Sequence, residues 1–304
     1  MTDRPRRPRR VQLSTPGSSE KMMQKASESK ADHVFLDLED AVAPSQKREA
    51  RKKIVQALKT LNWTGKTRCV RINDLTTEYA FEDIIEVVEG AGEHLDTIMM
   101  TKVMTPADVL FADKLLHQLE KKLQLKRRIG LEALIEEVEG MQNVDAIAKC
   151  TPRLECLVFG MGDFSASMGV TNKNVGESDG YPGDIWHYAR FRLVMACRAA
   201  GIDPVDGPFA DFRNPDAYRE ECRRSMILGC VGKWAIHPSQ IDVALEVYSP
   251  KPEDIARARK LEKAYAEAEA KGLGAINVDG VMVDVASIRI LRNTVLNKAD
   301  LYGL

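Results

Sequence analysis

The sequence has 304 residues, 44% of them hydrophobic, and a formal net charge of −1 at pH 7. This length suffices for one large domain or two small ones, and the near-neutral charge argues against a nucleic-acid or membrane partner. No apolar run reaches the roughly 18 residues that a membrane span needs. The six cysteines form no C-x-x-C pair, which favours a reduced, cytoplasmic protein over a disulfide framework.

The chain begins with a basic segment, Arg4-Pro5-Arg6-Arg7-Pro8-Arg9-Arg10. No apolar stretch follows it, so it is not a secretory signal. Because its two prolines oppose a helix, we predict a frayed, solvated tail, with phosphate binding as the alternative.

Short apolar runs typical of strands alternate with amphipathic stretches along the chain. The runs are Val11–Ser14, His33–Asp40, Thr67–Asn73, Thr97–Val103, Ile129–Glu136, Glu155–Asp163, Asp203–Gly207 and Gly232–His237. The stretches between them include Gln46–Lys59, Ala80–Glu89, Ala107–Lys122, Met141–Lys149, Ile185–Ala200 and Pro215–Leu228. Eight such units in about 240 residues predict an α/β fold of the closed (β/α)₈ TIM-barrel type. The rival is an open doubly wound sheet, but Thr15-Pro16-Gly17-Ser18-Ser19 after the first run is not G-x-G-x-x-G.

The pattern changes beyond residue 249. Pro250–Lys271 is typical of a long charged helix, and the alternating apolar residues of Ala275–Val283 around Asp279-Gly280 indicate a hairpin. Asp284 then occupies the N-cap position of a last helix. We therefore predict two domains, a barrel over 1–249 and a helix–hairpin–helix extension over 250–304.

Ionisable residues stand at the ends of seven of the eight strand-like runs. They are Asp37-Leu38-Glu39-Asp40, Arg71, Lys102, Glu136-Glu137, Asp163, Asp206 and His237. In a barrel, the carboxyl ends of the strands share one rim, where active sites lie. Clustered carboxylates raise one another's pKa unless a cation neutralises them, and Mg²⁺ prefers oxygen ligands. Glu136 and Asp163 end neighbouring strands and could share an ion, whereas no H-E-x-x-H motif or Cys/His cluster points to zinc.

Each of these residues also has a structural alternative when it is taken alone. Asp163 and Asp284 could cap helices, and Arg71 could form an ion pair with Asp40. Lys102 is most simply an ion-pair partner at the rim. The functional interpretation depends on the shared rim rather than on any single residue.

These motifs, in this order and spacing, resemble the citrate-lyase β-chain (HpcH/HpaI aldolase) family and especially the malyl-CoA lyases within it. The matching pieces are Thr15-Pro16-Gly17-Ser18, Leu36-Asp37-Leu38-Glu39-Asp40 with Ala43-Pro44 and Lys47, Val70-Arg71-Ile72-Asn73, Lys102-Val103, Leu134-Ile135-Glu136 before Gly140, Gly162-Asp163-Phe164 with Ala166-Ser167-Met168-Gly169, Trp186-His187, Val205-Asp206-Gly207-Pro208-Phe209 with Asp211-Phe212, and Gly232-Lys233-Trp234-Ala235-Ile236-His237-Pro238.

The resemblance implies a Mg²⁺ ion, with Mn²⁺ able to substitute, held by Glu136 and Asp163. It implies that Arg71 contacts the acid substrate and the thioester enolate. It also implies that a C-terminal lid carries Asp284, a catalytic base, into a neighbouring subunit of a homotrimer or homohexamer. The residues implied to bind CoA or substrate are Ser14, Thr15, Lys25, Arg71, Gly162, Asp163, Ile236 and His237.

One position departs from the family pattern. Ser19 stands in the loop where the family often has an arginine for the CoA phosphates. Lys21, Lys25 or an N-terminal arginine are the candidates to replace it.

The implied activity is a Mg²⁺-dependent, reversible aldol-type (Claisen) cleavage of (S)-malyl-CoA to acetyl-CoA and glyoxylate, with β-methylmalyl-CoA as a related substrate that yields propionyl-CoA. The alternatives are a citramalyl-CoA lyase, a malate-synthase-type condensation followed by thioester hydrolysis, and a citrate lyase β-like subunit of a larger complex. A regulatory barrel without turnover is a further class, but a binding module would need no base such as Asp284. One methyl group is worth only ~1–3 kcal/mol of discrimination, so the sequence leaves the acyl preference open.

Overall fold

The computed structural model describes residues 4–171 and 182–304. Eight parallel strands close into a barrel in chain order, with β8 paired to β1, which confirms the predicted fold class. The strands are β1 (Val11–Pro16), β2 (His33–Asp37), β3 (Thr67–Arg71), β4 (Thr97–Met100), β5 (Gly130–Ile135), β6 (Leu154–Phe159), β7 (Asp203–Asp206) and β8 (Gly232–Ala235).

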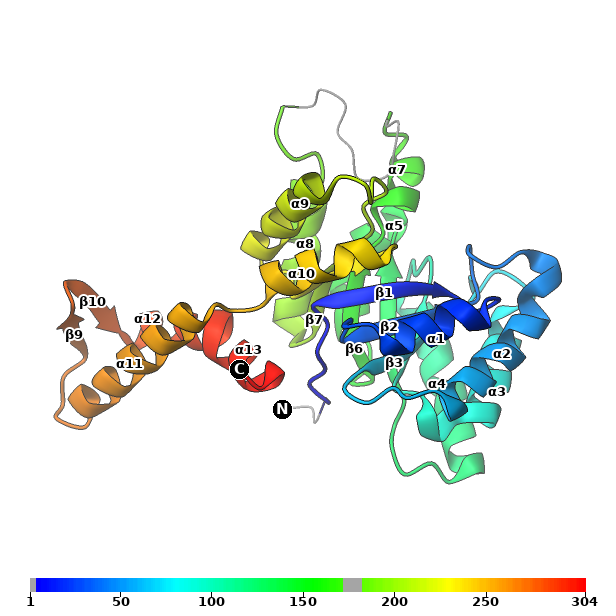
Figure 1. The fold of residues 1–304 in the computed structure, drawn as a ribbon, viewed down its shortest axis with the longest axis horizontal. Coiled ribbons are helices and arrows are strands. Elements are labelled where there is room, and N and C mark those ends of the chain that lie inside the picture. The colour runs from blue at the N-terminus through cyan, green and yellow to red at the C-terminus, as the bar shows by residue number, and fades with distance from the viewer. Residues whose placement is uncertain (1–3, 172–181) are drawn as a thin grey trace. The chain divides into compact units, whose positions relative to one another are not determined.

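Helices surround the barrel, and α1 to α4 lie outside the first strands (Figure 1). They are α1 (Glu20–Glu28), α2 (Lys47–Thr60), α3 (Ala80–Ala91), α4 (Pro106–Leu123), α5 (Val138–Gln142), α6 (Val144–Lys149), α7 (Met161–Met168), α8 (His187–Ala200), α9 (Pro215–Leu228) and α10 (Ile241–Tyr248). Short 3₁₀ turns are η1 (Pro44–Gln46), η2 (Gly92–His94) and η3 (Pro238–Gln240). Within the described residues, no helix has the length and apolar character to cross a bilayer. All six cysteines are free thiols.

Several strands end earlier than the sequence pattern predicted. The run His33–Asp40 is a strand only to Asp37, because the Asp37 carboxylate turns back and accepts the backbone N–H groups of Glu39 (2.9 Å) and Ala41 (3.2 Å). The run Glu155–Asp163 ends at Phe159, so Asp163 lies in the first turn of helix α7 rather than on a strand. Helix α1 was not predicted because its buried stripe is short, only Met23, Ala26 and Ser27.

The barrel interior has a polar, an apolar and a second polar layer. Successive inward side chains on β2 are His33, Phe35 and Asp37, since alternate residues of a strand face the same side. The same order recurs on β5 with Glu132, Leu134 and Glu136 at its end. The middle layer is an apolar cluster of Phe35, Cys69, Met99, Leu134, Cys156, Val158, Val205 and Trp234. It separates polar groups at the amino ends of the strands from those at the carboxyl rim.

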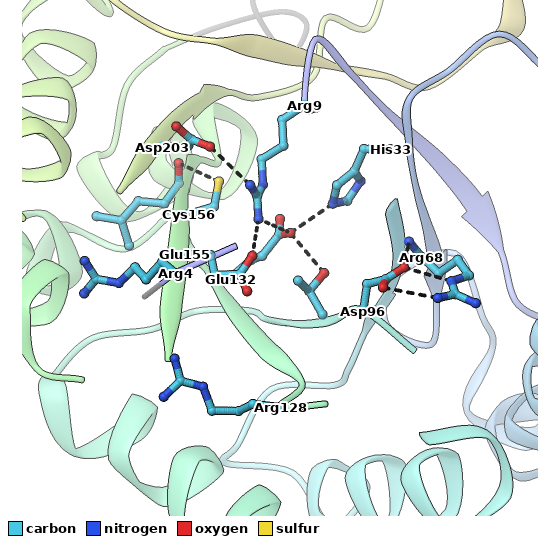
Figure 2. A network of polar contacts seen from close by, with 12 residues as sticks. Arg4, Arg9, His33, Arg68, Asp96, Arg128, Glu132, Glu155, Cys156 and Asp203 are labelled. Atoms are coloured by element: carbon cyan, nitrogen blue, oxygen red, sulfur yellow. Dashed lines mark hydrogen bonds and ion pairs between the residues drawn. The ribbon is translucent and has the colours of Figure 1, made fainter. Parts of the chain in front are cut away.

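The amino-end layer is organised around Arg9 (Figure 2). Its guanidinium is 1% exposed and contacts Glu132 (3.3 Å), Glu155 (2.9 Å) and Asp203 (3.1 Å). His33 Nε2 lies 3.0 Å from the same Glu132 carboxylate. The prediction of a solvated tail is therefore wrong for Arg9, because the acids at the starts of the strands need a buried counter-charge.

Replacing Arg9 with methionine is expected to lower the free energy of unfolding by about 3–5 kcal/mol, because a buried charge loses its partner. Urea denaturation measures this. The control is Lys122→Met, which breaks the exposed Lys122–Glu89 pair (2.6 Å) and should cost less than about 1 kcal/mol. Equal losses in the two variants would contradict a structural role for Arg9.

Residues 4–5 and 9–246 form the barrel unit, and residues 6–8 and 247–304 form a second compact unit. Its elements are α11 (Pro252–Glu269), β9 (Ala275–Val278), β10 (Val281–Asp284), α12 (Val285–Leu291), the π-helical turn η4 (Arg292–Leu296) and α13 (Asn297–Tyr302). Strands β9 and β10 form the antiparallel hairpin that the sequence indicated. Leu261, Tyr265, Val283 and Ile288 make its small apolar core.

Candidate active site

The candidate active site lies at the carboxyl rim of the barrel, where β2 to β6 end. Arg71, the last residue of β3, is 7% exposed and binds the Asp37 carboxylate through Nε (2.7 Å) and a terminal nitrogen (2.6 Å). Its other terminal nitrogen lies 3.1 Å from Glu39. The pairing with Asp40 considered from the sequence is thus replaced by Asp37 and Glu39. Burial opposes the charge of Arg71, but Asp37 outweighs it and raises the pKa of Arg71 above its ordinary value.

Lys102 joins two parts of this rim. Its ammonium donates to Glu39 at 2.8 Å, which confirms the ion-pair interpretation. Its backbone N–H donates to Glu136 Oε1 at 2.9 Å, and its φ is 48°, in the left-handed region that a non-glycine residue rarely adopts. The strained backbone of Lys102 therefore fixes the direction in which the Glu136 carboxylate points.

Glu136 and Asp163 are close enough to influence each other. Burial raises the pKa of Glu136 to about 8, and the charge of Asp163 adds to the rise. A Cβ at position 160 would lie 2.5 Å from Cβ of Glu136, so Gly160 provides the room for this side chain beside β6. A nearly buried carboxylate facing a second carboxylate needs a cation, and the oxygen-only donor set suits Mg²⁺. Glu136 and Asp163 therefore fit the ion that the resemblance implies.

Another group of possible ligands lies at the opposite end of the barrel and does not fit a metal. His33, Cys69 and Glu132 are buried close together. However, Glu132 already accepts hydrogen bonds from Gln12 (3.1 Å) and Thr97 (3.0 Å) as well as its contacts with Arg9 and His33. Burial raises the pKa of the Cys69 thiol well above its ordinary value, so it stays protonated, whereas a thiol must lose its proton to bind a metal.

Asp206 does not belong to the open rim, although it ends β7. Its side chain is fully buried and bonds to Lys233 (2.5 Å) and to Arg190 (2.9 and 3.1 Å). The reason is the alternation along the strand, because Val205 belongs to the inner apolar cluster and its neighbour points outward. The prediction that Asp206 joins the rim is therefore wrong, and its role is structural.

The positions expected to bind CoA lie around β1, α1 and β8. Ser14 and Thr15 are on β1, and Thr15 is buried, whereas Lys25 is exposed in the last turn of α1. Ile236 and His237 follow β8 and are exposed. The His237 ring stacks on Phe212 with centroids 4.5 Å apart, and its Nδ1 accepts the Ser239 backbone N–H at 3.2 Å. Gly162 is half-buried in α7, next to Asp163.

The structure narrows the set of residues that could replace the arginine missing from the loop at Ser19. Arg9 and Arg10 are engaged at the amino end of the barrel, Arg10 with Asp32 at 2.6 Å, so they do not replace it. Lys53 was not considered from the sequence, yet its ammonium donates to the Ser18 carbonyl at 3.2 Å and brings a cation from α2 to the loop. No sequence signal marks it, because the contact joins residues far apart in the chain.

Asp284 lies in the second unit, at the end of β10. It is the N-cap of α12, and its carboxylate accepts from the Ser287 backbone N–H and hydroxyl, each at 2.8 Å. The Ser287 backbone N–H holds the pKa of Asp284 below its ordinary value. The expected capping role is therefore present, and the carboxylate is ionised and able to accept a proton.

Comparisons with known proteins identify the family of this chain. The model of the HpcH/HpaI aldolase/citrate lyase family matches residues 10–238. An L-malyl-CoA/β-methylmalyl-CoA lyase of Cereibacter sphaeroides is 42% identical over 94% of this chain and 93% of its own length. The human mitochondrial citramalyl-CoA lyase is 33% identical over 95% and 85%.

A solved structure shares the fold as well. Protein CitE from Mycobacterium tuberculosis, in complex with magnesium, acetoacetate and coenzyme A, has a TM-score of 0.74 and 27% identity over 95% of this chain and 97% of that one. With the match to the family model and relatives above 40% identity across nearly the whole length, the chain belongs to the HpcH/HpaI aldolase/citrate lyase family.

Proposed function

We propose that this protein is a Mg²⁺-dependent carbon–carbon lyase that cleaves (S)-malyl-CoA to acetyl-CoA and glyoxylate, and β-methylmalyl-CoA to propionyl-CoA and glyoxylate. The observation that carries the proposal is the rim itself, where the Glu136–Asp163 acid pair lies beside a buried, fixed Arg71. The 42% identical relative that bears this activity in its name adds independent support.

Glu136 and Asp163 would hold the ion, which, when bound, supplies a Lewis acid for the oxygens of the acid substrate. Arg71 would stabilise the enolate. In cleavage, the hydroxyl group of malyl-CoA would give its proton to the Asp284 carboxylate and become the aldehyde oxygen of glyoxylate. The electron pair of the broken C–C bond moves onto the thioester oxygen as an enolate. The Arg71 guanidinium is already held by Asp37 and Glu39, so it needs no reorganisation when negative charge develops on the thioester oxygen.

Asp284 would be the acid–base group. In condensation its carboxylate takes a proton from the methyl group of acetyl-CoA and passes it to the new hydroxyl group. In cleavage it passes the hydroxyl proton to the enolate carbon. Closure of the C-terminal segment over a site removes water from Asp284 and raises its pKa toward a value suited to a base. We propose that this site belongs to a neighbouring subunit, in a homotrimer or homohexamer, and that Mn²⁺ can replace Mg²⁺.

The CoA end would lie along β1, α1 and the turn after β8. Ser14, Thr15 and Lys25 would bind CoA, and Ile236 and His237 would hold its pantetheine–thioester end. Lys53 is the additional cation at the loop that lacks the family's arginine.

The test is to incubate the purified protein with (S)-malyl-CoA, with and without Mg²⁺, and trap glyoxylate as its phenylhydrazone. Glyoxylate that forms only with Mg²⁺ is the expected result. No glyoxylate from malyl-CoA or β-methylmalyl-CoA would overturn the proposal. Formation of pyruvate from citramalyl-CoA would then identify a citramalyl-CoA lyase, the activity for which the 33% identical human relative is named.

A further inference from the structure

Trp234 lies directly beneath the guanidinium of Arg71. It is on β8 and 5% exposed, and its ring centroid is 4.6 Å from that of Phe35 on β2. The central carbon of the Arg71 guanidinium is 5.4 Å from the Trp234 ring and 5.7 Å from the Phe35 ring. Arg71 therefore rests on two aromatic faces, which attract a cation, while Asp37 binds its edge.

The orientation of the Trp234 ring is itself fixed by hydrogen bonds on the amino-end side of the barrel. Its indole N–H donates to Oε1 of Gln12 on β1 at 2.8 Å, and Nε2 of Gln12 donates to Oε2 of Glu132 at 3.1 Å. Gln12 and Glu132 are both fully buried. An indole only donates and an ionised carboxylate only accepts, so the group that joins them must do both, as an amide does.

Glu132 is in turn held in place by the amino-end network of Figure 2. Arg9 and His33 contact its Oε1, and Thr97 donates to the same oxygen at 3.0 Å. Its Oε2 is the atom that accepts from Gln12. A continuous series of buried contacts thus runs from this network through the apolar layer to Arg71.

We propose that Trp234 and Gln12 are positioning residues for Arg71, with the indole as a platform for the guanidinium and the Gln12 amide as the brace that orients the indole. This inference rests on the proposed function, in which Arg71 stabilises the enolate. A guanidinium bound only at its edge by carboxylates could still tilt, and the platform removes that freedom. A pre-oriented cation stabilises the transition state more than the bound substrate, so its loss should lower kcat rather than raise KM.

The variants Trp234→Leu, Trp234→Phe and Gln12→Met separate the platform from the brace. Trp234→Leu removes the aromatic face and should lower kcat about 30-fold, the value of a desolvated cation–π contact, with KM for the thioester within about threefold. Trp234→Phe keeps a face but loses the N–H, and Gln12→Met removes the brace. Each should lower kcat by about three- to tenfold, the value of one hydrogen bond, and the Trp234→Phe/Gln12→Met double variant should be no slower than Trp234→Phe.

Asp113→Asn is the control for a purely structural effect. It weakens the contact of Asp113 with the buried Arg153 (2.6 Å), which is outside this series of contacts, so it should lower Tm and leave kcat unchanged. A folded Trp234→Leu protein with wild-type kcat would overturn the proposal, as would single effects that simply multiply in the double variant. If Trp234→Leu does not fold, the kcat values of Trp234→Phe, Gln12→Met and their double variant test the proposal. Wild-type kcat in both single variants, or effects that multiply in the double variant, would overturn it.

A second measurement does not depend on turnover. In protein labelled with ¹⁵N-arginine, the Arg71 Nε proton should exchange slowly with solvent in the wild type, because it is buried against Asp37 at 2.7 Å. We expect its exchange to be at least about tenfold faster in Trp234→Leu, and closer to the wild-type rate in Trp234→Phe. Unchanged exchange in Trp234→Leu would refute the platform, even if malyl-CoA proved not to be the substrate.

Discussion

Replacement of Arg71 by lysine is expected to lower kcat for malyl-CoA cleavage by about 10²–10³-fold, the usual effect of removing one preorganised contact to a developing oxyanion. A lysine keeps the charge but cannot bind Asp37 with two parallel hydrogen bonds and cannot lie flat on the Trp234 ring. The cation would therefore lose its fixed position, and steady-state kinetics at saturating Mg²⁺ measures the result.

The matched control lies on the same strand. Arg68 binds Asp96 through Nε (2.8 Å) and a terminal nitrogen (3.2 Å), with the same two-point geometry but at the start of β3. Arg68→Lys should leave kcat within about twofold, because Arg68 lies at the opposite end of β3 from the rim. An Arg71→Lys enzyme as active as the Arg68→Lys enzyme would show that Arg71 has no special role.

Replacement of Glu136 by glutamine is expected to abolish the Mg²⁺-dependent activity. The amide keeps the shape and can still accept the Lys102 backbone N–H, but it lacks the charge that a divalent cation requires. We expect Mg²⁺ affinity, measured by calorimetry, to fall by at least about 100-fold and glyoxylate formation to fall with it.

Glu139→Gln serves as the control, because Glu139 is an exposed acid in α5, only three positions along the chain. Its Mg²⁺ affinity and activity should match the wild type. If Glu136→Gln bound Mg²⁺ as tightly as Glu139→Gln does, the ion would have to be held elsewhere.

The barrel could be predicted from the sequence because each strand is a short apolar run and most of the longer helices have a clear amphipathic period. The ends of the strands were less accurate, since polar groups such as Asp37 begin to bond the following loop before the apolar pattern stops. Helix α7 was hidden because Asp163 continues an apolar run, and only the local backbone shows that a helix has begun.

The rim residues could also be predicted, but their partners could not. The direction of a side chain at a strand end depends on register, which places Arg71 inward and Asp206 outward among Arg190 and Lys233. The burial of Arg9 could not be foreseen, because the acids that it neutralises come from strands far away in the chain. The basic composition of residues 4–10 predicted a solvated tail, whereas Arg9 in this segment balances the buried charges of Glu132 and Glu155.

The unusual backbone of Lys102 left no sequence signal either. Glycine or asparagine would mark a left-handed position, but a lysine does not. Its conformation is maintained by two contacts. The Glu136 carboxylate accepts its backbone N–H, and its side-chain ammonium forms an ion pair with Glu39. Both contacts join different strands and become visible only when the barrel closes.

The central claim is that the site is completed by Asp284 of a second chain, and subunit mixing tests it most directly. Asp284→Asn and Glu136→Gln proteins are each expected to be inactive alone. In randomly mixed oligomers, a site built across subunits would combine an intact rim with an intact Asp284, so about a quarter of the wild-type activity should return. No recovery, although mass spectrometry shows mixed oligomers, would contradict the claim and assign Asp284 to its own chain or to no catalytic role.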